Sequence, residues 1–242
     1  MSNFLTAIKR LSKALFTNRC RLCGEVTELD RELCEECEAK KRIPENRCKH
    51  CGCAKEDCTC KEHKNEYKQI AAPYYYEDSI VRAVHNFKDN DMPFLAEHMA
   101  CEMAKDIEKY YCEITFDCIT FVPLRKFRVL KRGFNQSELL AKELSKILNV
   151  KAVPLLTKVR YTGVQHHKTA KQRAADTYGA YDVLDDFKDK LSGKTILLVD
   201  DVKTTGSTLN ECAKMLKIYG ADAVYCTSFA ITKREKNKPD TV

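Results

Sequence analysis

The 242-residue chain has no tryptophan and no long hydrophobic run. No stretch approaches the ~18 consecutive apolar residues of a membrane-spanning helix, which excludes a helical membrane protein. Residues 1–19 also lack the continuous apolar segment and the small-residue cleavage site of an export signal, so we expect a cytoplasmic protein. Apolar residues nevertheless make up 44% of the chain, which is enough for a full hydrophobic core.

The formal charge of +7 comes from 42 basic and 35 acidic residues, but it also depends on the 14 cysteines. Four thiolates around one Zn²⁺ have a net charge of −2, so two such sites would lower the total to about +3. The overall charge is therefore a weak argument for a nucleic-acid partner, and local clusters of cations carry more weight.

The chain divides into three zones and a tail. Residues 1–19 have basic residues and apolar residues at helical spacing, which predicts a basic amphipathic helix that docks on the protein itself or on a membrane surface. Residues 20–66 are rich in cysteine and charge, so they need a metal or disulfides to fold. Residues 67–232 have the alternating strand and helix pattern of a parallel-sheet domain, and residues 233–242 form a polar tail.

Within the large domain the pattern predicts an α/β fold, a parallel, doubly wound sheet with helices on both faces. We expect strands over 70–76, 116–122, 195–199 and 223–231, and helices over 92–110, 135–148 and 207–219. Asn135 is typical of a helix N-cap, and Gly220 is typical of the residue that follows a helix.

Nine cysteines lie between residues 20 and 60. Without an export signal, such a cluster is typical of metal ligands rather than disulfides. Two CxxC pairs can complete a tetrahedron of thiolates around one zinc ion, with Zn–S distances of about 2.3 Å. This first cysteine group comprises Cys20, Cys23, Cys34 and Cys37.

A second set of five cysteines offers more thiols than one zinc needs. The spacing favours a second cysteine group of Cys48, Cys51, Cys58 and Cys60. Cys53 is then a spare thiol, with His63 nearby. The spacing also permits an interleaved arrangement, in which Cys20 and Cys23 share one ion with Cys48 and Cys51. We therefore expect one or two zinc ions. Four thiolates leave no open position, which predicts structural sites in a small zinc-ribbon-like domain.

The segment from residue 196 to residue 208 has the pattern of a phosphate-binding turn. Four apolar residues predict a buried strand with Asp200 and Asp201 at its carboxyl end, where parallel sheets bind ligands. A short loop then leads into a helix, so free backbone N–H groups and the helix dipole meet at one place. The residues predicted to bind phosphate there are Thr204, Thr205, Gly206, Ser207 and Thr208.

Two carboxylates would repel a bare polyphosphate, but they accept hydrogen bonds from the two hydroxyls of a ribose. The pattern therefore predicts a ribose 5-phosphate unit as the ligand. It is not a Walker loop, because no lysine follows the glycine, and it has no GxGxxG turn. The simpler alternative is a solvated acidic turn before an N-capping hydroxyl.

Residues 196–208 resemble the phosphoribosyl-pyrophosphate motif of type I phosphoribosyltransferases: four apolar residues, two acids and a Thr/Gly/Ser loop. Lys203 departs from that motif, since many members have an apolar residue there. The resemblance implies that Asp200 and Asp201 hold the ribose hydroxyls and that Thr204–Thr208 hold the 5′-phosphate of phosphoribosyl pyrophosphate, which binds with Mg²⁺.

Other segments resemble ComF-type competence proteins. Residues 122–141 are similar to their "VPL…RGFNQSELLA" run, and cysteine pairs precede the phosphoribosyltransferase-like domain, as in that family. Residues 160–181 fit its "R…Q…R..N..GAF" stretch, although Asp176 replaces the usual Asn and Tyr181 the usual Phe. The residues in its flexible-loop and "KF/KY" positions, which are candidates for the diphosphate, are Lys88, Arg160 and Arg173.

Five cations follow the strand that ends before Pro123, namely Arg125, Lys126, Arg128, Lys131 and Arg132. Such a basic loop at the sheet edge suits a diphosphate with Mg²⁺, held by Arg125 or Arg132. It is also consistent with a solvated loop. In a third interpretation it binds single-stranded nucleic acid, with bases stacked on Phe127 or Phe134. The phosphate contacts would then come from Lys126, Arg128, Lys131, Lys168 and Lys171.

Two hypotheses of function follow. In the first, the ComF resemblance implies a protein of DNA uptake that binds phosphoribosyl pyrophosphate and handles single-stranded DNA in the cytoplasm, beside the helicase and channel proteins of uptake. In the second, the chain is an active phosphoribosyltransferase of unknown acceptor, unrelated to DNA. A transferase would break the anomeric C–O bond and stabilise the departing pyrophosphate electrostatically. No residue stands out as a general base.

Overall fold

The structure is a computed structural model of the chain. It describes residues 18–233 apart from 29, 61–64, 90–91 and 160–178. The predicted amphipathic helix and polar tail fall almost entirely outside the described residues, as do Arg160, Lys168, Lys171 and Arg173. Among the described helices, none is both long enough and apolar enough to cross a bilayer.

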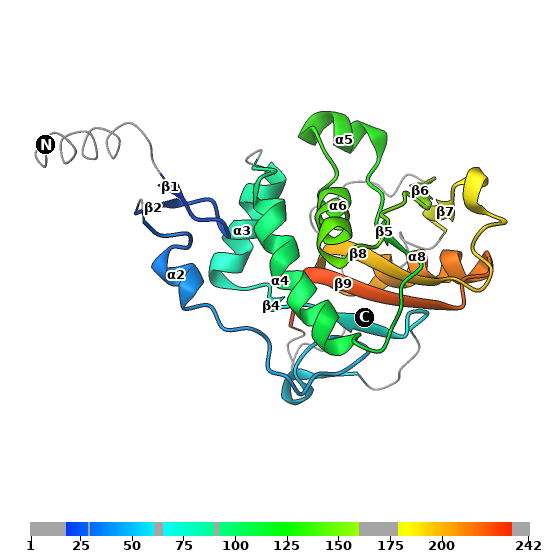
Figure 1. Ribbon diagram of the computed structural model, residues 1–242, viewed down its shortest axis with the longest axis horizontal. Helices are drawn as coiled ribbons and strands as arrows, with labels where there is room; N and C mark the ends of the chain where they lie inside the picture. The colour runs from blue at the N-terminus through cyan, green and yellow to red at the C-terminus, as the bar shows by residue number, and fades with distance from the viewer. Residues whose placement is uncertain (1–17, 29, 61–64, 90–91, 160–178, 234–242) are drawn as a thin grey trace, which may run out of the picture.

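A five-stranded parallel sheet forms the centre of the molecule (Figure 1). Its order is β3 (Gln69–Ala71), β9 (Ala223–Ile231), β8 (Thr195–Lys203) and β5 (Cys118–Phe121), and β4 (Tyr74–Tyr75) pairs with the end of β9. Every pair in this sheet is parallel, as the sequence pattern predicts. The strand predicted over 70–76 is interrupted between β3 and β4 by a proline, which has no N–H to donate to a sheet.

Helices cover both faces of this sheet (Figure 1). On one face lie α3 (Asp78–Asp89), α4 (Leu95–Tyr110) and α6 (Gln136–Leu148), and on the other lies α8 (Ser207–Ile218). This arrangement confirms the predicted fold class, in which a parallel sheet is buried between two layers of helices.

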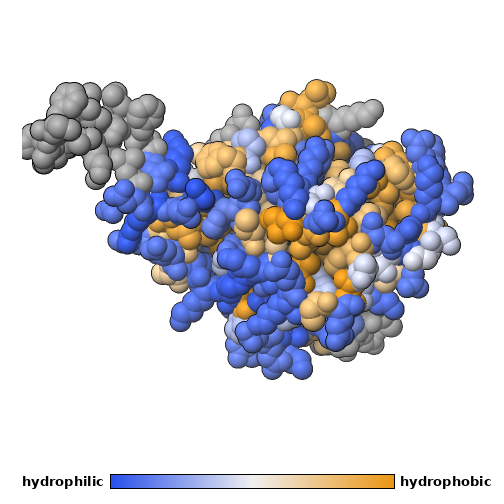
Figure 2. Space-filling model, in the orientation of Figure 1, coloured by the Kyte–Doolittle hydropathy of each residue, from blue (hydrophilic) through white to orange (hydrophobic). Residues whose placement is uncertain are grey.

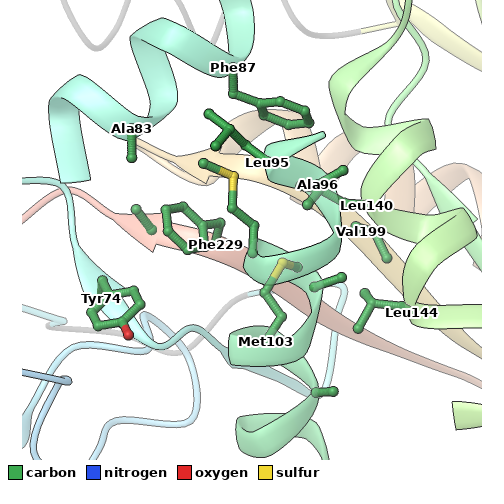
Figure 3. Packing of buried hydrophobic residues seen from close by; sticks show 14 of the residues in the cluster. Tyr74, Ala83, Phe87, Leu95, Ala96, Met103, Leu140, Leu144, Val199 and Phe229 are labelled. Carbon is green, nitrogen blue, oxygen red and sulfur yellow. The ribbon is translucent and has the colours of Figure 1, made fainter. Parts of the chain in front are cut away.

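Two hydrophobic cores result, one on each face of β8. Because successive side chains of a strand point to opposite faces, Leu197 and Val199 belong to the core beneath α3, α4 and α6. Figure 3 shows this core, in which Val199 and Phe229 of the sheet meet Met103 of α4 and Leu140 of α6. The intervening residues of β8 pack against α8 instead.

The ends of two elements bear directly on the site. α6 follows Asn135, whose side-chain oxygen accepts a hydrogen bond from the Ser137 N–H at 3.1 Å, as expected of an N-cap. β8 is longer than the predicted strand and continues to Lys203, because β9 pairs with it as far as Ile231. Both acidic residues therefore lie on the strand rather than after it.

Four of the five cations lie in a helix whose N-cap is the fifth, Arg125, which corrects the predicted basic loop. This helix, α5, spans Lys126–Arg132 and ends at Gly133, whose φ of 79° is a left-handed conformation that glycine adopts readily. Lysine, arginine and leucine favour helices, but seven residues show too little apolar periodicity to be recognised as one from the pattern.

Shorter elements complete the described fold. Two antiparallel pairs join β1 (Asn18–Arg19) with β2 (Val26–Thr27) and β6 (Leu156–Lys158) with β7 (Tyr181–Val183), and the single turns are α2 (Glu35–Glu38), η1 (Lys55–Asp57) and η2 (Asp185–Phe187).

Buried ion pairs attach the segment between the two cysteine groups to α4. Arg42 contacts Glu102 and lies 2.6 Å from one oxygen of Asp106, while Arg47 binds the other oxygen of Asp106. The Tyr74 hydroxyl donates to Glu102 at 2.9 Å. The Asp106 side chain is only 4% exposed, so its charge depends on these arginines for the interactions that water would otherwise supply.

We expect Asp106→Ala to lower the free energy of unfolding by about 3 kcal/mol, because it leaves two arginines without their shared carboxylate. Urea denaturation followed by circular dichroism measures this change. The control is Glu45→Ala, which removes an ion pair with Lys109 at the surface and should change stability little. Equal effects of the two variants would contradict the structural role of Asp106.

Candidate functional site

Two carboxylates lie next to each other at the carboxyl end of β8. Asp200 accepts a hydrogen bond from the Ser137 hydroxyl of α6 at 2.9 Å. Asp201 forms an ion pair with Lys88 of α3, with 2.6 Å between Oδ2 and Nζ, and both of these side chains are mostly buried. Two helices on the same face of the sheet therefore reach the acidic pair.

The surroundings of Asp200 and of Lys88 shift the pKa of each of these two side chains. Burial and the charge of Asp201 raise the pKa of Asp200 to about 7, although the Ser137 hydroxyl and the Lys88 ammonium oppose that shift. Burial tends to lower the pKa of Lys88, but the attraction of Asp201 outweighs it and raises this pKa overall. Lys88 is therefore charged at neutral pH, and Asp200 keeps its proton to a higher pH than an ordinary aspartate does.

The phosphate loop, residues Thr204–Gly206, connects β8 with α8. Gly206 has a φ of 85° and precedes the first turn of α8, whose N–H groups are directed at the loop, and that of Ser207 donates to the Thr205 hydroxyl oxygen at 3.3 Å. A Cβ at Gly206 would lie 3.1 Å from Cε of Lys203, which leaves little room for a side chain. The Thr205 and Ser207 hydroxyl oxygens lie 2.9 Å apart. The loop thus presents hydroxyl and backbone donors to an anion.

A lysine and a tyrosine lie on the opposite side of the acidic pair. The Lys158 ammonium lies 3.0 Å from the Tyr181 hydroxyl and 4.8 Å from the centre of its ring. Burial, followed by the charge of Arg128 on α5, lowers the pKa of Lys158, and Asp200 acts in the other direction. Burial also raises the pKa of Tyr181, whose hydroxyl hydrogen-bonds the Thr208 side chain. These residues connect α5, β6, β7 and α8 around the site.

The structure brings some of the predicted site residues together. Asp200, Asp201 and the phosphate loop converge at one sheet edge, and Lys88 reaches the same point from α3. Arg132, at the end of α5, instead forms an ion pair with Asp89 of α3 at 3.3 Å. The remaining described candidates lie on α5, where Arg125 is half-buried at the N-cap and Arg128 and Lys131 are exposed, while Lys126 begins the helix.

Sequence reasoning missed two residues of this site. Ser137, which holds Asp200, lies two residues after the N-cap of α6, where a helix presents its first side chains to the sheet edge. The only signal for it was its place in the run from 122 to 141. Lys158 lies in the three-residue strand β6, where no motif marks it, and its contact with Tyr181 depends on the pairing of β6 with β7.

The first cysteine group comes together as the spacing predicts. The four sulfurs of Cys20, Cys23, Cys34 and Cys37 all lie within 4.8 Å of one another. Sγ of Cys23 and Sγ of Cys34 are 3.7 Å apart, close to the ~3.8 Å edge of a tetrahedron with Zn–S distances of 2.3 Å. These thiols therefore fit a zinc ion.

The second cysteine group has the same geometry. The sulfurs of Cys48, Cys51, Cys58 and Cys60 also lie within 4.8 Å of one another, and those of Cys51 and Cys58 are 3.7 Å apart. Cys20 and Cys23 therefore do not share a site with Cys48 and Cys51, so the interleaved arrangement does not occur. Cys53 belongs to neither group, as its role of spare thiol implies.

The two groups repeat one backbone turn. In each, the glycine after the CxxC pair donates its N–H to the carbonyl of the first cysteine at 2.8 Å. The N–H of that first cysteine donates in turn to a carbonyl five residues later, that of Glu25 or Cys53. Gly24 and Gly52 have φ values of 76° and 80°, which the turn requires.

Comparison with known proteins identifies the class of the large domain. A model of the phosphoribosyl transferase domain family matches residues 131–241, which include the acidic pair and the phosphate loop. In its parallel sheet and this match, the large domain is similar to phosphoribosyltransferase domains, and a cysteine-rich region precedes it.

Relatives align along most of the chain. Competence protein F of Haemophilus influenzae is 28% identical over 86% of this chain and 95% of its own length. The DNA utilization protein YhgH of Escherichia coli is 28% identical over 85% of this chain and 86% of its own length. Competence protein ComFC of Bacillus subtilis is 25% identical over 84% of this chain and 85% of its own length. These matches and the two cysteine groups confirm the resemblance to ComF-type competence proteins.

Solved structures match the chain more distantly. Adenine phosphoribosyltransferase of Saccharomyces cerevisiae is 18% identical, with a TM-score of 0.39 over 58% of this chain and 70% of that chain. The purine phosphoribosyltransferase of Pyrococcus horikoshii is 20% identical, with a TM-score of 0.37 over 61% of this chain and 79% of that chain.

The raised pKa of Asp200 predicts a pH-dependent stability. A carboxyl with a higher pKa in the folded than in the unfolded state binds its proton more tightly when folded, so stability falls as pH rises from about 4 to about 7. We expect Asp200→Asn to melt at a higher temperature than the wild type at pH 8 and at a similar temperature at pH 4. Asp222→Asn, at an exposed position, is the control. A constant difference at all pH values would contradict the assignment.

Proposed function

We propose that the chain binds phosphoribosyl pyrophosphate with Mg²⁺ at the carboxyl end of β8 and acts in the cytoplasmic handling of incoming single-stranded DNA. The observation that carries the first part is the convergence of the acidic pair and the phosphate loop within the phosphoribosyl transferase domain match. The second part rests on relatives named competence protein F and DNA utilization protein.

In this proposal each part of the site has a role. Asp200 and Asp201 accept hydrogen bonds from the ribose hydroxyls, and the donors of the phosphate loop hold the 5′-phosphate. Lys88, released from Asp201 when the ribose enters, turns its ammonium toward the diphosphate. Arg125 and Arg132 are further candidates for that group, since guanidinium groups bind phosphate oxygens in pairs.

The residues present are compatible with magnesium. Mg²⁺ prefers phosphate oxygens with one or two carboxylates and water, and the acidic pair beside a diphosphate offers such a set. When bound, the ion neutralises charge on the diphosphate. The contribution of this chain is to orient the ribose and to place cations where the pyrophosphate departs.

The thiols of the two cysteine groups support structural zinc sites. Each group offers four sulfurs at tetrahedral spacing and no position for a substrate. Zinc-bound thiolates also suit a reducing compartment such as the cytoplasm, where disulfides are rare.

Calorimetric titration of phosphoribosyl pyrophosphate with Mg²⁺ tests the ligand site. We expect saturable binding by the wild type and a loss of roughly 100-fold or more in Asp200→Asn/Asp201→Asn, because two charged acceptors are removed. The matched control is Asp185→Asn/Asp186→Asn, a second pair of adjacent acids that lies on η2 away from the site. A wild type that does not bind, or a double variant that binds normally, would overturn this part of the proposal.

The surface of α5 favours a nucleic-acid role. Phe127 is 75% exposed and Leu130 is 83% exposed, while Arg128 and Lys131 are exposed on the same helix. Figure 2 shows this hydrophobic surface at the top of the view, where Figure 1 places α5. An exposed aromatic ring among cations is what unpaired bases and their phosphates recognise.

We expect the wild type to bind single-stranded DNA with an affinity that falls steeply with salt. In Arg128→Ala/Lys131→Ala, the slope of log affinity against log salt should decrease by about 1.4, because two phosphate contacts are lost. The control is Lys142→Ala/Lys146→Ala, which removes two exposed cations from α6. Fluorescence anisotropy measures the binding.

Failure to bind DNA at low salt would leave the second candidate function, a phosphoribosyltransferase whose acceptor is unrelated to DNA. Release of pyrophosphate from phosphoribosyl pyrophosphate in the presence of an acceptor would then be its signature.

A further inference from the structure

A buried tyrosine connects the second cysteine group with the phosphate loop. His50, which lies between Cys48 and Cys51, offers its backbone carbonyl to the Tyr67 hydroxyl at 2.8 Å. Tyr67 is 3% exposed, and its hydroxyl oxygen lies 3.5 Å from the position that a Cβ would take at Gly206. This side chain therefore fills the space between a metal-binding turn and the glycine of the phosphate loop.

Backbone contacts make a second connection at the same place. The Ile70 N–H of β3 donates to the Lys49 carbonyl at 2.9 Å. Gly52 packs so closely on Ile231 of β9 that a Cβ would overlap that side chain. Ile231 is the register partner of Lys203, the last residue of β8 before the phosphate loop. The turn that contains Gly52 therefore packs on the end of β9, next to the residue of β8 that precedes the phosphate loop.

The first turn of α8 is attached to the same segment. The Asn65 side chain donates to the His50 carbonyl at 2.8 Å, so this carbonyl accepts two hydrogen bonds. The next residue, Glu66, donates its N–H to the Asn210 side chain of α8 at 2.7 Å. Both ends of the phosphate loop are therefore supported from the second cysteine group.

The first cysteine group has a different neighbour. The Asn86 side chain of α3 donates to the Cys23 carbonyl at 2.5 Å, and Gly24 packs against Met92. Among the described residues, these contacts lead to α3 and its core rather than to the phosphate loop. The two groups share one local geometry but support different parts of the molecule.

We propose that the second cysteine group, when it holds its metal, positions the phosphate loop through Tyr67. The proposal rests on the ribose 5-phosphate site proposed above. Metal binding folds a segment of this kind, since residues 48–60 have few apolar side chains to order them otherwise. Without the metal, the His50 carbonyl no longer holds the Tyr67 hydroxyl in place, and the loop loses the surface on which it rests. Tyr67 is a positioning residue that does not itself touch the ligand.

Tyr67→Phe tests this connection with a minimal change. We expect it to keep the zinc content and melting temperature of the wild type and to bind ribose 5-phosphate roughly five- to ten-fold more weakly, the effect of one net hydrogen bond. The matched control is Tyr111→Phe. Its buried hydroxyl also donates to a backbone carbonyl, that of Cys226 in β9 at 2.7 Å, which belongs to neither cysteine group nor the phosphate loop, so binding should be unchanged.

Serine variants of each group test the metal itself. The wild type should contain two zinc equivalents by metal analysis, and Cys51→Ser and Cys34→Ser should each contain one. We expect Cys51→Ser to lose at least ten-fold in affinity for ribose 5-phosphate and Cys34→Ser to retain it. Circular dichroism establishes that each variant is folded.

The outcomes separate this inference from the proposed function. If the wild type does not bind ribose 5-phosphate or phosphoribosyl pyrophosphate, the ligand site itself is wrong. If the wild type binds while folded Tyr67→Phe and Cys51→Ser bind equally well, the site stands and the positioning role is overturned. Equal weakening in Cys34→Ser and Cys51→Ser would also overturn it, because the effect would then be a general loss of stability.

Discussion

The repulsion between two adjacent carboxylates is the constraint around which the site is built. Asp200 and Asp201 lie at the end of a buried strand, where burial and the charge of Asp201 raise the pKa of Asp200. An ammonium group from α3 and a hydroxyl from α6 contact the pair, and these two helices lie on one face of the sheet with α4 between them. Without a ligand, the repulsion between the two carboxylates destabilises the fold. In the proposed function, the same two groups accept hydrogen bonds from the two hydroxyls of a ribose.

The cysteine-rich region obeys a different constraint, which is the lack of a hydrophobic core of its own. Its order depends on the two tetrahedral thiol clusters and on its attachment to the large domain. Arg42 and Arg47 connect the stretch between the clusters to buried carboxylates of α4, and the glycine after each CxxC pair packs on the main fold. The cysteine-rich region thus packs directly on the sheet and on α3. The proposed role of Tyr67 depends on this packing.

Much of the architecture could be predicted because it depends on local pattern. Four apolar residues before two acids predicted β8, Asn135 predicted the start of α6, and CxxC spacing predicted both thiol clusters. Where the pattern was too short or was interrupted, prediction failed. The seven residues of α5 were interpreted as a loop, and Pro73 divides a strand that composition alone made continuous.

The sequence by itself determined the class of fold, the acidic turn before α8 and the sets of cysteines, because each is either a local pattern or a succession of local patterns along the chain. Only the tertiary structure decided that Lys88 pairs with Asp201, that Ser137 holds Asp200, and that Tyr67 lies beneath Gly206. The reason is that these contacts join segments 63 to 139 residues apart along the chain. Their distances are set by the register of the parallel strands and by how the helices pack on them, and neither leaves a local signal.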